Sequence, residues 1–155
     1  MSETADREIR LTRLLKAPRE LVWQVWTDPA HVDHWWGPNG FQNATHEMQV
    51  APGGVWRYMM HGPNGVDYPN RIDYLEVVRP EKLVYDHGAD DGAPAHFHVV
   101  VTFDEDPAGT LLTLCLIFPT AEARDQVIRE HGAIEGGNQT LARLAEYVEP
   151  MAASH

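Results

Sequence analysis

The sequence predicts an α+β domain in which an antiparallel β-sheet is covered by a long C-terminal helix. Residues 7–118 contain several short segments in which apolar and polar side chains alternate, the pattern of strands with one buried face. Most of these segments are joined by short turns, which is typical of an antiparallel meander. Residues 120–148 then carry a helical pattern and form the only predicted element long enough to cover the apolar face of the sheet.

The first strand is expected at residues 7–15, followed by two short helices. Pro18 fits the first turn of the first helix, because its fixed φ suits that position and its missing N–H is not needed there. Asp28-Pro29 ends this helix, and Gly37-Pro38 ends a second one of one or two turns. Both helices are therefore predicted to be short.

Six further strands are expected before the C-terminal helix. The clearest alternation places Phe97 and Val99 on one face of a strand and His96 and His98 on the other. Pro52-Gly53-Gly54 marks a hairpin turn. The six predicted strands are residues 41–50, 55–60, 70–78, 83–87, 95–104 and 111–118.

The C-terminal helix is predicted as one element over residues 120–148, with Thr120 able to cap its start. Its glycines, Gly132, Gly136 and Gly137, each cost about 1 kcal/mol relative to alanine, so they indicate a need for space beside the helix. We interpret the middle of this helix as the wall of a cavity. The stripe expected to face the sheet consists of Val127, His131, Ile134, Asn138, Leu141, Ala145 and Val148.

Five stretches together resemble a known superfamily. They are APRELVW at residues 17–23, WWGP at 35–38, PGGVWRY at 52–58, VVRPEKLVY at 77–85 and GAIEGGNQTL at 132–141. The chain resembles the START-like or SRPBCC superfamily, and within it the bacterial branch related to the activator of the ninety-kilodalton heat-shock protein ATPase. The resemblance implies a helix-grip fold, in which a seven-stranded antiparallel sheet curls around the C-terminal helix. It suggests one domain over residues 7–149 with flexible termini at 1–6 and 150–155.

Members of this superfamily bind apolar molecules between sheet and helix, and a minority catalyse reactions there. An apolar cavity with a few placed polar groups is the usual form of a small-molecule site, and the alternative is a filled core. The candidate ligand-binding residues are Trp35, Trp36, Trp56, Tyr58, Met60, Phe97, Val99, Leu112, Leu114, Leu116, His131, Ile134 and Asn138.

His131 and Glu135 are the candidate catalytic residues, since a buried histidine can act as a general acid or base near neutral pH. No acid and base pair stands at a known spacing, so catalytic residues are not assigned. No cofactor and no metal are expected, because the chain has no phosphate-binding glycine loop, dinucleotide fingerprint or characteristic zinc spacing. His96 and His98 could share a metal, but they fall opposite the apolar face. Cys115 has no evident activating base.

The net charge of -11 argues against a nucleic-acid partner, because phosphate binding needs clustered Lys and Arg. A single cysteine excludes an internal disulfide and fits a reducing compartment. No apolar run suits a signal peptide or a membrane span, so we expect a cytoplasmic protein, monomeric or homodimeric. The leading hypothesis is the binding of a small apolar molecule. The alternatives are a cofactor-independent cyclase, hydratase or hydrolase, and a chaperone ATPase-activator-like role with a protein partner.

Overall fold

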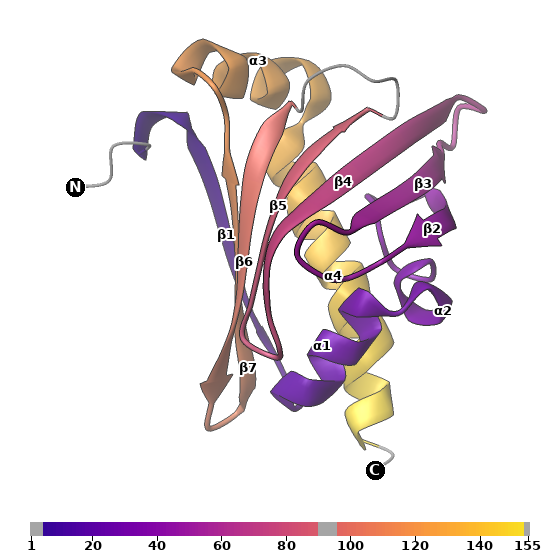
Figure 1. Cartoon of the computed structure of the whole chain (residues 1–155), viewed down its shortest axis with the longest axis vertical. Coiled ribbons are helices and arrows are strands. Elements are labelled where there is room, and N and C mark those ends of the chain that lie inside the picture. The colour runs from indigo at the N-terminus through magenta and orange to yellow at the C-terminus, as the bar shows by residue number, and fades with distance from the viewer. Residues whose placement is uncertain (1–4, 90–95, 154–155) are drawn as a thin grey trace.

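The computed structural model describes residues 5–89 and 96–153 and contains the predicted seven-stranded antiparallel sheet (Figure 1). The strand order across the sheet is β1-β7-β6-β5-β4-β3-β2, so only β1 and β7 pair out of sequence order. The strands are β1 (Glu8–Leu15), β2 (Gln42–Met48), β3 (Val55–His61), β4 (Asp67–Val78), β5 (Lys82–Ala89), β6 (Phe97–Asp106) and β7 (Gly109–Ile117). The expected α+β class and strand number are confirmed.

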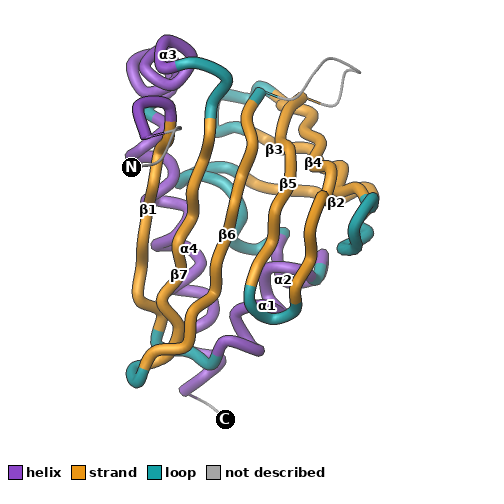
Figure 2. The backbone as a smooth tube through the Cα atoms, turned by 60° about the vertical axis from the view of Figure 1, so that its left-hand side comes forward, coloured by secondary structure: helices purple, strands orange, loops and turns teal. Residues whose placement is uncertain are grey.

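The helices lie on one side of the sheet, and the longest of them crosses it (Figure 2). The two short helices predicted after the first strand are present as α1 and α2. The helical elements are η1 (Ala5–Arg7), α1 (Arg19–Thr27), α2 (Pro29–Val32), α3 (Ala121–His131) and α4 (Ala133–Ala153). The last helix continues through Pro150, beyond the end at residue 148 that the pattern predicts.

The C-terminal helix is not the single element that the sequence pattern suggested. Gly132 adopts a left-handed conformation with φ 57° and ψ 44° and ends α3, while its N–H donates to the carbonyl of Ile128. The N–H of Gly136 then bonds to the carbonyl of Gly132 in the first turn of α4. A left-handed residue stops a helix because the next N–H groups no longer follow its axis. The prediction of one helix over 120–148 is therefore wrong at Gly132.

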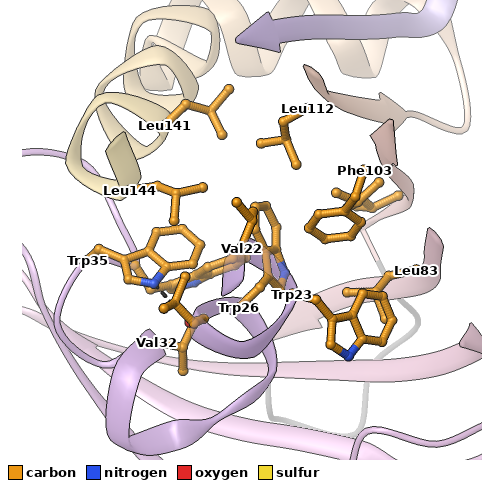
Figure 3. Close-up of a cluster of buried hydrophobic side chains, with 14 of the residues drawn as sticks. Val22, Trp23, Trp26, Val32, Trp35, Leu83, Phe103, Leu112, Leu141 and Leu144 are labelled. Carbon is orange, nitrogen blue, oxygen red and sulfur yellow. Dashed lines mark hydrogen bonds between the residues drawn. The ribbon is translucent and has the colours of Figure 1, made fainter. Parts of the chain in front are cut away.

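Aromatic residues of α1 and of the segment after α2 fill one end of the space between sheet and helix (Figure 3). Trp26 and Trp35 are 1% and 0% exposed, with ring centroids 5.0 Å apart. The indole N–H of Trp35 donates to the carbonyl of Val25 at 3.0 Å, which satisfies its polar atom inside the core. Phe103 and Leu112 from the sheet pack against this cluster, as do Leu141 and Leu144 from α4. Buried side chains thus fill the space between α1, α4 and the sheet (Figure 3).

Candidate ligand pocket

A pocket of about 250 Å³ lies between the sheet and the first turns of α4. Its floor consists of side chains from β3, β5, β6 and β7, and its roof is the start of α4. Six of the candidate residues line it: Trp36, Met60, Phe97, Val99, Leu114 and Leu116. Among the described residues, the lining contains no Asp, Glu, Lys or Arg side chain. The pocket is therefore apolar and can accept an uncharged molecule without placing a charge in a dry site.

Four candidate residues belong to the solid core and do not line this pocket. Trp56 and Tyr58 are each 1% exposed and pack on one another with ring centroids 4.3 Å apart. The side chains of Trp35 and Leu112 are fully buried in the cluster around α1. These four residues face inward as predicted, but other side chains separate them from the open space.

Two candidates on α4 were placed on the wrong face. Ile134 is 42% exposed and Asn138 is also exposed, and both border a groove on the outer surface with Gln139. The first turns of α4 face the pocket with small residues instead, namely Ala133, Gly136, Gly137 and Thr140. In this part of the helix, the apolar stripe therefore predicts the wrong face to be directed at the sheet. Glu135 is exposed as well, and the side chain of His131 lies outside the described part of the structure.

Gly136 and Gly137 both line the pocket, but their surroundings differ. A Cβ added to Gly137 would collide with the Cδ1 atom of Leu11, which is itself buried. A Cβ added to Gly136 would meet only Pro38, at an ordinary contact distance of 3.5 Å. The absence of a side chain at position 137 thus allows the close approach of α4 to β1.

We expect Gly136→Ala to raise the free energy of unfolding by about 0.5–1 kcal/mol, because alanine removes backbone freedom from the unfolded chain and fits its site. Gly137→Ala removes the same backbone freedom from the unfolded chain, but its Cβ atom must displace Leu11. We therefore expect this substitution to be neutral or destabilising. Urea denaturation of both variants measures the difference. Equal stabilisation by the two substitutions would contradict the close approach of β1 to Gly137.

His87 and Tyr85 of β5 line the pocket and were not among the predicted site residues. The sequence pattern could have identified them, because Leu83, Tyr85 and His87 stand at every second position of a predicted strand and share its inward face. Trp26 and Thr140 also line it, and the Thr140 hydroxyl donates to the carbonyl of Gly136 at 3.0 Å. The polar atoms of the pocket thus come mainly from one strand, β5.

Two polar side chains lie within hydrogen-bond distance of Nε2 of His87, and in the neutral ring this atom can bond to only one of them. Nε2 lies 2.8 Å from the Tyr58 hydroxyl and 3.2 Å from Oδ1 of Asn70. Burial, together with nearby His96, lowers the pKa of His87 to about 4, so the ring is neutral at pH 7. The Tyr58 hydroxyl is buried and needs an acceptor for its proton, whereas Asn70 is only partly buried and can bond to water. The contact of Nε2 with Tyr58 is the shorter of the two, and the Tyr58 hydroxyl is the group that must donate. We therefore assign the lone pair of the ring to Nε2 and its proton to Nδ1.

Tyr58 and Tyr85 both carry neutral hydroxyls. Burial raises the pKa of each phenol well above its ordinary value of 10. A neutral phenol can donate one hydrogen bond, and the proton of Tyr58 is already directed at His87. The pocket therefore contains neutral polar groups beside an apolar surface.

Arg143 fixes the turn that closes one side of the pocket. Its Nη1 atom donates to the carbonyls of Gly37 and Pro38 at 2.8 and 2.9 Å, and both of these residues line the pocket. Longer contacts of 3.5 Å reach the carbonyls of Trp36 and His34. One guanidinium of α4 thus caps the carbonyl groups left open after α2.

Other polar candidates pair away from the pocket. His98 lies 2.9 Å from Asp86 and His61 lies 2.6 Å from Asp67, both as partly exposed pairs. Burial, with a contact to Glu8, raises the pKa of Cys115 to about 11, so its thiol is protonated at neutral pH. In residues 5–89 and 96–153 no three His, Cys, Asp or Glu side chains gather as a metal site requires. None of the helices in this part of the chain has the length and apolar run needed to cross a bilayer.

A seven-stranded antiparallel sheet that grips a long C-terminal helix, with an apolar pocket between them, defines a helix-grip protein. The chain belongs to the family described as Activator of Hsp90 ATPase homolog 1-like protein, whose model matches residues 16–149. This confirms the resemblance to the START-like and SRPBCC superfamily and to its bacterial branch. No curated protein matches the chain.

Several solved structures have this fold over nearly the whole chain. Protein NE0264 of Nitrosomonas europaea is 27% identical, with a TM-score of 0.86 over 96% of this chain and 98% of its own. Protein CV1439 of Chromobacterium violaceum is 28% identical, with a TM-score of 0.78 over 93% and 98%. An AHSA1-like protein of Aeromonas hydrophila, at 21% identity, has a TM-score of 0.74 over 96% of each chain and supports the fold alone.

Proposed function

We propose that the chain binds a small, uncharged and largely apolar molecule in the pocket under the start of α4. The observation that carries this proposal is the lining, whose described residues combine apolar side chains with neutral polar groups and include no ionised group at pH 7. Such a surface favours the transfer of an apolar molecule from water and disfavours a charged one.

The size of the pocket limits the ligand. Its volume of about 250 Å³ lies between the roughly 150 Å³ of an engineered cavity that binds benzene and the roughly 300–1,000 Å³ of drug-sized sites. A molecule with one or two rings fits this range. Larger lipids would require the walls to move.

A matched pair of substitutions on α4 tests the proposal. Thr140 lines the pocket, whereas Asn138 is exposed on the outer surface of the same helix. We expect the hydrocarbon α-methylstyrene, at ten times its Kd, to stabilise the wild-type protein and Asn138→Phe by about 1.4 kcal/mol. Thr140→Phe should lose this effect, because the new ring occupies the pocket.

Thermal unfolding with and without α-methylstyrene measures the effect, and circular dichroism checks that both variants fold. If Thr140→Phe and the wild-type protein respond equally, the ligand binds elsewhere and the proposal is wrong. If the wild-type protein does not respond to this probe or to related one- and two-ring hydrocarbons, the binding function loses its support.

The other roles considered from the sequence stay predictions. His131 and Glu135 were candidate catalytic residues only, and Glu135 is exposed and does not line the pocket. The chaperone role that the family name suggests is tested by a pull-down with a bacterial chaperone. The cytoplasmic location and the monomeric or homodimeric state are likewise expectations from the sequence.

A further inference from the structure

The hydroxyl of Tyr85 is a buried polar group without a partner in the described part of the chain. Tyr85 is 2% exposed and lines the pocket, and no hydrogen bond joins its hydroxyl to another described residue. Within that same part, the only fully enclosed side-chain polar atom without a partner is Oδ1 of Asn43. The Tyr85 hydroxyl therefore keeps access to open space, and the space beside this side chain is the pocket. Because buried polar groups need partners, it is available to a ligand.

A second donor lies two residues away on the same face of β5. In the tautomer assigned above, Nε2 of His87 accepts a hydrogen bond from the Tyr58 hydroxyl at 2.8 Å, and the single proton of the neutral ring is on Nδ1. Nδ1 has no partner among the described residues. The free polar atoms of the pocket floor are therefore a phenol O–H and an imidazole N–H. A ring N–H can only donate, and a phenol is well suited to donate.

These donors define the chemistry of the ligand. A carbonyl oxygen accepts hydrogen bonds and carries no net charge, whereas a carboxylate would place an uncompensated charge among the apolar side chains. We propose that Tyr85 is the polar anchor of the pocket and donates a hydrogen bond to the carbonyl oxygen of an uncharged ketone, aldehyde or ester, with His87 as the neighbouring donor. This inference rests on the proposed binding function and specifies its ligand class.

Two probes of nearly equal shape isolate the hydrogen bond. Acetophenone carries a carbonyl oxygen where α-methylstyrene carries a CH₂ group. We expect Tyr85→Phe to weaken acetophenone binding about five- to tenfold, the effect of one hydrogen bond, and to change the Kd of α-methylstyrene by less than about twofold. Comparing one protein variant across two probes cancels the difference in their hydration. NMR titration or calorimetry measures both Kd values.

A neighbouring tyrosine provides the control. Tyr74 is also 2% exposed and its ring centroid lies 6.0 Å from that of Tyr85, but it does not line the pocket. Tyr74→Phe should leave both affinities unchanged. Phenylalanine keeps the ring of Tyr85 and removes no hydrogen bond to a described residue, so the fold should persist.

The outcomes separate the two proposals. If Tyr85→Phe leaves acetophenone binding unchanged, or weakens both probes equally, Tyr85 is not the anchor, although the pocket still binds small molecules. If Tyr74→Phe reproduces the selective loss, the effect does not come from the pocket hydroxyl and the inference fails. If the wild-type protein binds neither probe, the proposed function fails, and the carbonyl specificity fails with it.

Discussion

Between pH 7 and pH 4.5, the wild-type protein is expected to lose about 2 kcal/mol more of its free energy of unfolding than His87→Gln. Burial lowers the pKa of His87 from 6.5 to about 4 in the folded protein. Between these two values the unfolded chain binds a proton that the folded protein does not, so lowering the pH favours unfolding. The full shift corresponds to about 3 kcal/mol, and the loss is complete below about pH 4.

Urea denaturation at several pH values measures this difference. Glutamine does not titrate and can still accept the hydrogen bond from Tyr58, so the substitution removes the titration more than the packing. Acidic groups also titrate in this range, but they are common to both proteins and cancel in the comparison. A parallel pH dependence of wild type and His87→Gln would show that His87 is not held neutral by burial.

The sheet could be predicted from the sequence because each strand has one buried and one exposed face. The alternation at residues 95–104 and 111–118 corresponds to β6 at Phe97–Asp106 and β7 at Gly109–Ile117. Strand ends shift by two or so residues, since turns and pairing partners set them rather than the alternation. The pairing of β1 with β7 has no local signal, because the two strands lie far apart in the sequence.

The glycines of the C-terminal helix have roles that the sequence pattern alone does not distinguish. Gly132 ends a helix in a left-handed conformation, Gly137 permits close packing on Leu11, and Gly136 borders the pocket. A glycine in a helical pattern is compatible with all three roles. The spacing of apolar residues could not distinguish these three roles, because the first turns of α4 have no large side chain on the face that points toward the sheet.

The sequence predicts which strand residues face inward but not which of them line the pocket. Strand alternation identifies inward residues, and Trp56, Leu112, Leu114 and Leu116 all face inward. Only packing decides which of them meet open space. The helices α1 and α2 bring Trp26 and Trp35 into one end of the grip (Figure 3), so the open space remains near the start of α4. That is why Tyr85 and His87 line the pocket whereas Trp56 and Leu112 do not.

Arg143→Met is expected to lower the free energy of unfolding by about 2–3 kcal/mol, because the substitution leaves the carbonyls of Gly37 and Pro38 without their charged donor. Methionine has a similar unbranched stem, so helix propensity and packing change little. Arg129 is an exposed residue of α3, and Arg129→Met should cost no more than about 0.5 kcal/mol. Urea denaturation of both variants at pH 7 gives the comparison.

The same substitution links stability to the pocket. Gly37 and Pro38 form part of the lining, so a turn released from Arg143 should bind α-methylstyrene more weakly, whereas Arg129→Met should bind it as the wild type does. A loss of stability with unchanged binding would show that Arg143 stabilises the contacts of the helix but not the wall of the pocket. Equal stabilities of the two variants would show that its hydrogen bonds to the turn contribute nothing. The expected result is a joint loss, because one guanidinium holds both the end of the α2 segment and the wall of the pocket.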